Sequence, residues 1–481
     1  MVGLLLGVLA GCANEVGPPD LVLITVDGWR ADGPSPGAEA ALTEAAGLQG
    51  TRYTRAWAQT PNPYVATGSL LTGVYPTAIP LCSSPNDSGA PPPCVTLPPE
   101  RPTLPEVLGI YGYHTARFER VASAEPAPTT WRGFSLQRSA RGADGAARAA
   151  TLTEAAAWWY AHADAPRFLS LALPVLTPEV AAAAAHAVSP EVYPPEERAT
   201  FLAEHPEVAE RLGGHSRWVL ANEAGVGLVT AAYVESARAI GQDLGRFLAG
   251  LPATRPRYVI LTSSWGLTLG ELDGTRTAEQ AGPATHELLL DRILRVPLLL
   301  SGPNLRARDV AAVVELVDLY PTLAALAGVV PPAGLSGTDL LAPPGPGPAY
   351  AHAEYGDMFA VRDEDALLLF RSQIHGSTSL DPEFTTRLTG RPPPGLRERL
   401  PPALQALSVN APPVVDDYEL YDLTADPLQT IRLDPLAAPD DLLRLYLEMV
   451  AWRTGPDAPP PGRMGWDEVQ QLRRQGLLHY F

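Results

Sequence analysis

Three short segments carry polar side chains whose types and positions could do chemistry. The apolar run LVLITV ends at Asp27-Gly28, and the run YVILTS ends at Ser264-Trp265. Ligands of open α/β sheets bind at the carboxyl ends of the strands, so we expect these two ends to lie at one site. A third segment, TPNPYVATGSLLTG, supplies hydroxyl groups between residues 60 and 73.

Carboxylates can hold a hard divalent cation, and an activated hydroxyl can act as a nucleophile. The acidic candidates for a metal are Asp27, Asp32, Glu271 and Asp273, and the hydroxyl candidates for a nucleophile are Thr60, Tyr64, Thr67 and Ser69. A structural interpretation stands beside this one. Asp27 alone could cap the turn after its strand, since Asx turns are common there, and Trp265 could be a core residue.

Hydrophobic patterns predict the elements that must position these residues. Short apolar runs, typical of buried parallel strands, begin at Leu21, Phe168, Tyr258 and Val296. Helical patterns begin at Thr103, Ala231 and Asp309, the last as two helical pieces with a break near Pro321. The segment SLLTGVYP is expected to begin a further helix. Strands that alternate with helices predict an α/β fold with a doubly wound, mostly parallel sheet.

Length and composition bound the class of protein. The chain has 481 residues, of which 46% are hydrophobic and 18% charged, so it can build one large α/β domain and a smaller one. Its net charge of −18 disfavours nucleic acid as a partner, because phosphate binding needs basic patches. The sequence contains no lysine, so no step can depend on an ammonium side chain.

The first nineteen residues resemble a bacterial lipoprotein signal and tether. The run MVGLLLGVLAGC is too short to span a bilayer and ends in Leu9-Ala10-Gly11-Cys12, a lipobox pattern in which Cys12 is acylated. No Lys or Arg precedes the run, and a buried strand with a chance cysteine is the alternative. Acylation would place the protein on the bacterial cell envelope, at the outer membrane or the periplasmic face, with the membrane as a partner.

Two other cysteines and a proline-rich run divide the remaining chain. Cys82 and Cys94 bracket a turn-rich loop and are predicted to form a disulfide in an oxidising envelope, since two cysteines alone rarely hold a metal. The run LAPPGPGPAY is a plausible linker. We therefore expect an α/β domain over residues 20–345 and a C-terminal α+β subdomain over 346–481.

Ordered motifs along the chain resemble the sulfatase family of the alkaline phosphatase superfamily. They are PDLVLITVDGWRAD, TRYTRAWAQTP, SLLTGVYP, TLPEVLGIYGYHTA, AAYVESARAIGQDLGRFLAGL, THELLLDRILRVPLLLSGP, VDLYPTLAALAG and YELYDLTADPLQT. The resemblance implies an alkaline phosphatase-like sheet, a divalent cation, usually Ca²⁺, and hydrolysis of sulfuric esters. It also implies a formylglycine nucleophile made from Cys or Ser in the pattern Cys/Ser-x-Pro-x-Arg before the L-L-T-G motif.

The chain departs from the family pattern at each of these chemical groups. The nucleophile position falls on Pro63, and the pattern's Arg falls on Thr67. Asp27 is kept as one metal ligand, but the partner positions Gly28, Ser264 and Trp265 are not typical ligands. The family's histidine before the L-R-V-P strand corresponds approximately to His286, shifted by one residue, and the family lysine is missing.

Two functional hypotheses follow. In the first, the protein is a catalytically inactive sulfatase-like lipoprotein with no cofactor, and it binds an envelope glycan or protein or has a structural role. Losses at separated segments favour this hypothesis, because such groups act as a unit. In the second, it hydrolyses sulfuric esters or phosphoesters with a rebuilt Ca²⁺-dependent site, for which Asp27, Thr67 and His286 are the residual candidates.

Overall fold

The computed structural model describes the regular elements of the chain and part of the segments between them. The described residues are 17–31, 37–79, 97, 99–121, 131–175, 180, 223–266, 289–343, 347–353, 358–371, 418–426, 429, 433, 441, 444, 445, 448, 449 and 452. Several predicted site residues lie outside these ranges, and the predictions about them stay predictions. They are Cys12, Asp32, Cys82, Cys94, Glu271, Asp273 and His286.

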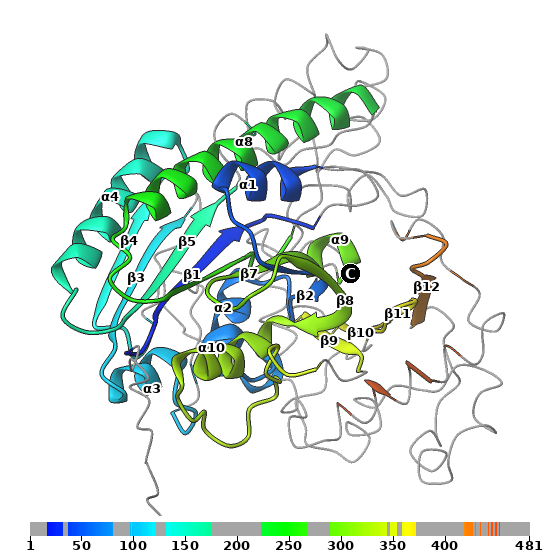
Figure 1. The fold of residues 1–481 in the computed structure, drawn as a ribbon. Coiled ribbons are helices and arrows are strands. Elements are labelled where there is room, and N and C mark those ends of the chain that lie inside the picture. The colour runs from blue at the N-terminus through cyan, green and yellow to red at the C-terminus, as the bar shows by residue number, and fades with distance from the viewer. Residues whose placement is uncertain are drawn as a thin grey trace, which may run out of the picture.

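A large eight-stranded sheet forms the centre of the fold (Figure 1), in the spatial order β4-β3-β5-β1-β6-β7-β2-β8. Its strands are β1 Asp20–Asp27, β2 Thr51–Trp57, β3 His114–Val121, β4 Leu136–Arg141, β5 Arg167–Pro174, β6 Arg257–Thr262, β7 Arg295–Ser301 and β8 Arg308–Glu315. Strand β7 is antiparallel to β6 and β2, and every other neighbouring pair is parallel. The predicted α/β class with a mostly parallel sheet is confirmed.

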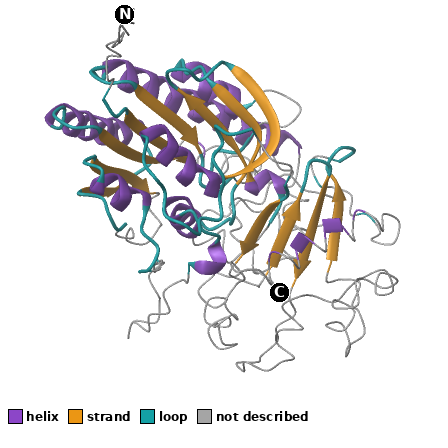
Figure 2. Ribbon diagram, turned by 60° about the horizontal axis from the view of Figure 1, so that its bottom comes forward, coloured by secondary structure: helices purple, strands orange, loops and turns teal. Residues whose placement is uncertain are grey.

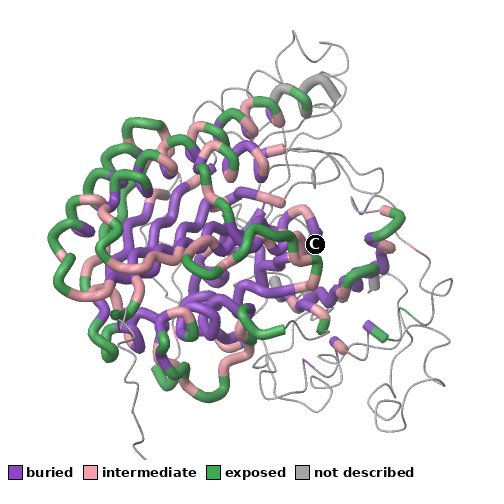
Figure 3. Tube along the Cα trace, in the orientation of Figure 1, coloured by how far each residue is buried: buried purple, intermediate pink, exposed green. Residues whose placement is uncertain are grey.

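Helices cover both faces of this sheet (Figure 1). On one face lie α1 Ala38–Ala46, α4 Gly145–Ala161 and α8 Glu223–Gly250, and on the other lie α2 Pro63–Thr72, α3 Leu104–Ile110 and α10 Leu319–Ala327. Short elements η1 Pro76–Ala78, α9 Asp291–Leu294 and η3 Leu316–Asp318 join the rest. Figure 3 shows the result: the strands are buried between the helices, α4 and α8 expose their outer faces, and α2 is buried. The sheet has a separate hydrophobic core under each helix layer.

The segment from Asp309 was predicted as two helical pieces; the second contains helix α10, but the first is not a helix, and that part of the prediction was wrong. Residues 308–315 form strand β8, which pairs in parallel with β2. Its three valines favour an extended chain, and the partner strand supplies the backbone hydrogen bonds. Pro321 does not break a helix either. It is the third residue of α10, where a missing N–H costs nothing because the first four have no partner within the helix.

A second, antiparallel sheet lies within the predicted C-terminal subdomain (Figure 2). Its strands are β9 Ala349–Ala353, β10 Met358–Arg362, β11 Ala366–Arg371 and β12 Tyr418–Asp422, in the order β12-β11-β10-β9. Two hydrophobic clusters join this sheet to the main domain. One of them contains Tyr75 and Val317 from the main domain together with Phe359 and Trp452.

Glu315, at the end of β8, is buried at this junction. Its carboxylate accepts hydrogen bonds from the Tyr75 hydroxyl at 2.7 Å and from the backbone N–H of Tyr350 on β9 at 2.9 Å. Asp318 lies beside it and accepts from the Glu315 N–H at 2.8 Å. No ion pair among the described residues includes either acid. Burial, and then the charge of Asp318, raise the pKa of Glu315 to about 8, and burial raises the pKa of Asp318 to about 6.

These shifts predict that the junction weakens as the pH rises. The folded pKa of Glu315 exceeds its ordinary value of 4.5, so the folded state holds a proton that the unfolded state releases between about pH 4.5 and 8. Over that window one such proton lowers the free energy of unfolding by about 1.4 kcal/mol per pH unit. Urea unfolding at several pH values should show that the free energy of unfolding of Glu315→Gln falls less steeply with pH than that of the wild type. The exposed Glu364→Gln is the matched control, and an unchanged slope in Glu315→Gln would contradict the assignment.

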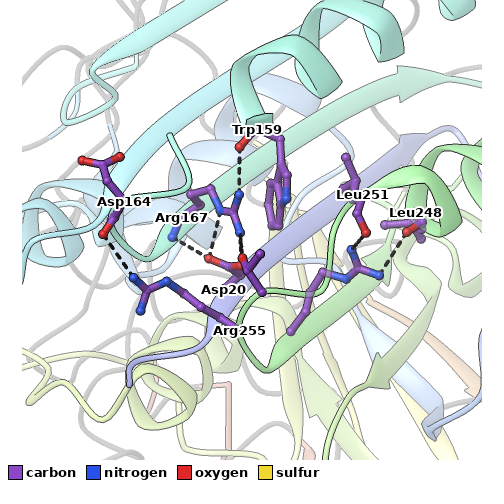
Figure 4. Close-up of polar contacts among 9 residues, drawn as sticks. Asp20, Trp159, Asp164, Arg167, Leu248, Leu251 and Arg255 are labelled. Carbon is purple, nitrogen blue, oxygen red and sulfur yellow. Dashed lines mark hydrogen bonds and ion pairs between the residues drawn. The ribbon is translucent and has the colours of Figure 1, made fainter. Parts of the chain in front are cut away.

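At the opposite end of the main sheet, a buried ion pair fixes the start of β1 (Figure 4). Asp20 accepts from the Arg167 side chain at 3.1 and 2.5 Å and from its backbone N–H at 2.9 Å. The guanidinium also donates to the Trp159 carbonyl at 2.8 Å and lies over its indole ring at 4.1 Å. Both charged side chains are almost fully buried, so each depends on the other.

Removing one partner should therefore be strongly destabilising. We expect Asp20→Ala to cost about 3–5 kcal/mol, because it leaves the Arg167 charge buried and uncompensated. Asp309→Ala, which removes the exposed pair with Arg52, should cost about 0–1 kcal/mol. Chemical denaturation of the two variants measures the difference, and equal costs would show that Asp20 contributes no more than a surface charge.

Candidate functional site

The two strand ends that carry Asp27 and Ser264 meet as predicted. Strands β1 and β6 are parallel neighbours, with Thr25 opposite Thr262, so the residues two positions further lie at the same edge of the sheet. The Ser264 hydroxyl donates a hydrogen bond of 2.5 Å to Oδ1 of Asp27. The Gly28 N–H donates to the Trp265 carbonyl at 3.1 Å and ties the two turns together.

Gly28 shapes the turn after β1. Its φ of 83° lies in the left-handed region, which side chains disfavour, and Trp29 N–H donates to the Val26 carbonyl across the same turn at 3.0 Å. The position that would hold a second metal ligand is therefore a backbone turn position in this chain. Trp265 is 4% exposed and belongs to the core cluster on the α8 face, together with Trp29 and Tyr233. It is a core residue, as one of the two interpretations predicted.

The half-buried Asp27 carboxyl has a perturbed pKa. Burial raises this pKa to about 6, against the lowering effects of the Ser264 hydrogen bond and the Arg117 charge and with a smaller raising effect from Glu119. Arg117 and Glu119 are buried on β3, where the guanidinium donates to Glu119 at 3.3 Å and to Ser170 at 2.8 Å. Asp27 therefore lies in the field of a buried ion pair.

Sequence analysis missed Arg117 and Glu119. The signal was present, because in HTARFER the charged residues alternate with Ala116 and Phe118, which lie in the core cluster on the α8 face. In a strand, such alternation puts the charged residues on one face. Only the sheet order, with β5 between β3 and β1, brings that face within electrostatic range of Asp27.

The described residues around Asp27 do not fit a divalent cation. Ca²⁺ takes six to eight oxygen ligands, several of them carboxylates. Among the residues that the structure describes, no group of three or more Asp, Glu, His or Cys side chains could hold a metal. The Ser264 hydroxyl that is bonded to the Asp27 carboxylate donates its proton there. The further acidic candidates Asp32, Glu271 and Asp273 lie outside the described ranges.

The predicted nucleophile segment forms the start of helix α2. Pro63 is its first residue, a position that proline favours because no N–H is needed there. Oδ1 of Asn62 accepts from the N–H groups of Tyr64 at 3.0 Å and Val65 at 3.3 Å, and the Asn62 carbonyl accepts from Ala66 at 2.8 Å. We call this arrangement the α2 self-cap. It occupies the backbone donors with which a helix start would otherwise bind an anion.

The hydroxyl candidates near this helix are buried, and two of them form hydrogen bonds with the backbone. Thr60 accepts from the Asn62 N–H at 3.2 Å, and Ser69 donates to the Val74 carbonyl. Thr67 is 8% exposed and lies in the middle of α2. The expectation that SLLTGVYP begins a helix was wrong. Residues 69–72 end α2, because Gly73 adopts φ 66° and its N–H closes the last turn onto the Ser69 carbonyl at 2.8 Å.

Comparison with known proteins now decides the family. A sequence model of the sulfatase family, described as "Sulfatase", matches residues 19–329, which covers most of the main domain. The chain belongs to the sulfatase family. The matched range contains every described residue of the site above, including Asp27, Pro63 and Ser264.

Individual relatives of this sulfatase-family chain are distant or match over short segments. Arylsulfatase K of Mus musculus is 49% identical over 49 residues, which is 10% of this chain and 9% of the relative. The chain thus matches only about a tenth of the length of such curated relatives. Two solved structures match over almost the whole chain at low identity. They are BT4656 in complex with its substrate D-glucosamine-2-N,6-O-disulfate (14% identity, TM-score 0.56, 92% and 99% of the two chains) and the phosphonate monoester hydrolase of Agrobacterium radiobacter (17%, 0.56, 95% and 96%).

The contact between Asp27 and Ser264 gives a direct prediction. Because the Ser264 hydrogen bond stabilises the Asp27 carboxylate, Ser264→Ala should raise the Asp27 pKa above its value of about 6. The measurement is a pH titration of the Asp27 carboxyl carbon by NMR with labelled aspartate, assigned with Asp27→Asn. Ser263→Ala is the control, because that hydroxyl donates to the Trp265 carbonyl instead. A lower or unchanged pKa in Ser264→Ala would contradict the assignment.

Proposed function

We propose that this sulfatase-family protein is catalytically inactive and serves as a binding or structural component of the bacterial cell envelope. The α2 self-cap is the observation that carries the proposal. The position that corresponds to the family's nucleophile is Pro63, which has no side-chain heteroatom and cannot attack an ester. The next two N–H groups are occupied by Asn62 of the same chain.

The Asp27–Ser264 contact supports the same proposal. The Asp27 carboxylate accepts the proton of the Ser264 hydroxyl, a residue type that is a weak ligand for a divalent cation. With neither an attacking group at Pro63 nor a described set of metal ligands, the groups that would have to act together are not assembled in the described part of the chain. A scaffold of this kind can still bind a ligand without transforming it, and we infer that the ligand is an envelope glycan or protein and not nucleic acid.

A second candidate function is hydrolysis of sulfuric esters or phosphoesters by a rebuilt site. The pKa of Asp27, about 6, favours it, because a general base works best near the ambient pH. The solved relatives with similar folds include a phosphonate monoester hydrolase and a protein that binds a disulfated glucosamine. On this alternative Ca²⁺ would be the cofactor, and Thr67 and His286 would be residual catalytic candidates.

We also propose that Cys12 is acylated and anchors the protein to the membrane. The lipobox pattern Leu9-Ala10-Gly11-Cys12 supports it. Among the described residues, no helix has both the length and the apolarity to cross a bilayer. The predicted Cys82–Cys94 disulfide would suit the oxidising envelope.

Inactivity predicts neither turnover nor tight metal binding. The purified protein should carry well below one equivalent of Ca²⁺, Mn²⁺ or Zn²⁺ and should hydrolyse aryl sulfates, phosphates and phosphonates no faster than a buffer blank. Added Ca²⁺ should leave the melting temperature unchanged, because only an ion that binds the folded state would raise it. Elemental analysis and steady-state assays make the measurement, with the Agrobacterium radiobacter phosphonate monoester hydrolase as a positive control. One equivalent of metal together with turnover abolished in Asp27→Ala would establish the second candidate instead.

A further inference from the structure

Large apolar side chains are exposed at one edge of the main sheet. The exposed fractions are 81% for Ile110, 49% for Tyr111, 58% for Tyr160 and 75% for Val330. Leu341, at 41%, is the other large hydrophobic residue that is exposed in the described part of the chain. Single exposed apolar residues are normal on soluble proteins, so their common location is what requires an explanation.

The topology places these four residues toward the end of the main sheet at which the parallel strands start. Ile110 and Tyr111 end α3 and precede the start of β3, and Tyr160 lies at the end of α4, shortly before β5 begins. The Tyr160 hydroxyl donates to the carbonyl of Gly250, the last residue of α8, at 2.6 Å. Val330 follows the end of α10, which packs against α3 and β1. We call the surface formed by Ile110, Tyr111, Tyr160 and Val330 the basal edge, since the parallel strands start there.

The beginning of the described chain lies at the same edge. The Asp20 N–H donates to the Pro256 carbonyl, just before β6, at 2.8 Å. A Cβ on Gly17 would lie 3.2 Å from the Arg255 side chain, which donates to the Asp164 carbonyl at 3.2 Å (Figure 4). The Asp164 carboxylate in turn contacts His114 at 3.3 Å, three residues beyond Tyr111. A chain of contacts thus connects the tether to the basal edge.

The length of the tether limits how far this edge can be from a bilayer. Asp20 lies eight residues after Cys12, and even fully extended this segment spans only about 26–29 Å. Pro18 and Pro19 stiffen the end next to the fold. This step rests on the proposed acylation of Cys12, which fixes the far end of the tether at the membrane surface.

The charges at the basal edge do not oppose such a contact. Arg255, Arg306 and Arg308 lie at or before strand starts there, alongside Asp164, Glu44 and Asp339, while Asp20 and Asp309 pair with arginine. The edge thus lacks the excess of negative charge that the whole chain carries, −18. Anionic lipid head groups would repel most of this protein's surface more strongly than they repel this edge.

We propose that the basal edge is the surface that rests on the lipid bilayer to which Cys12 is attached. Tyrosine side chains and aliphatic tips suit the head-group region, where an apolar body and a polar end are both accommodated. Four such residues bind weakly by themselves, but the tether keeps the edge at a high local concentration beside the lipid. The contact therefore orients the anchored protein, and it places Asp27 and Ser264 at the edge that faces away from the membrane.

Depth-dependent fluorescence quenching tests the orientation. The full chain is produced in acylated form, and Cys12 modification is verified by mass spectrometry. It is then reconstituted into vesicles of phosphatidylethanolamine and phosphatidylglycerol with or without brominated acyl chains. Ile110→Trp adds a reporter at the basal edge, and Arg238→Trp adds one on the exposed side of α8 as the matched control. The signal is the difference from the wild type, which already contains nine tryptophans.

We expect brominated lipid to remove most of the emission that the Ile110→Trp reporter adds and to leave the emission added by the Arg238→Trp reporter unchanged. Combining Tyr111→Ser and Val330→Ser with the basal reporter should restore its emission, since both residues are exposed and the fold does not depend on them. Acylated protein with an unquenched basal reporter, or with equal quenching of both reporters, would overturn the basal edge and leave the anchor intact. A mature chain without acylated Cys12 would overturn the inference at its premise, while the activity and metal assays above would still decide the enzymatic question.

Discussion

Strand β1 has parallel partners on both sides, and this constraint determines where the two ends of its sequence must go. Six residues from Leu21 to Val26 are buried against both helix layers, which leaves an aspartate at each end of the strand. Asp20 meets Arg167 at one edge, and Asp27 meets Ser264 at the other. The first contact compensates a charge with a charge, whereas the second offers only a hydroxyl. The same strand is thus firmly fixed at its start and electrostatically less satisfied at its carboxyl end.

The remaining buried acids fall into the same two classes. Asp291 pairs with the buried Arg362 at 2.5 Å and connects α9 to β10, so it joins the main domain to the second sheet by an ion pair. Glu315 joins the same two parts through neutral donors, and its pKa is raised. One joint is therefore an ion pair, and the other is a carboxyl group whose pKa is raised by burial. Since the chain contains no lysine, arginine is the only permanent cation available for either kind of joint.

Much of the fold follows from the sequence, and the exceptions have physical reasons. Runs such as LVLITV and YVILTS predict strands because both faces are buried, so no polar alternation interrupts them. Strand β8 was missed because its outer half is exposed at the end of the sheet, and its Ala and Val residues also fit a helical pattern. The meeting of Asp27 and Ser264 was predictable from parallel strand ends. The approach of Arg117 to Asp27, and of Tyr75 to Glu315, depends on sheet order and on contacts across 240 residues, which local patterns do not encode.

The α2 self-cap limits which substitutions could give this scaffold the family's nucleophile pattern. Replacing Pro63 by serine or cysteine would place a heteroatom in the helix, yet Asn62 would still hold the Tyr64 and Val65 N–H groups. Val65 and Thr67 would still stand where the maturation pattern requires proline and arginine. A single substitution would therefore not complete the family's nucleophile pattern. Asn62 and Pro63 meanwhile both favour the helix that they begin, so the residues that depart from the pattern at this point also stabilise the fold.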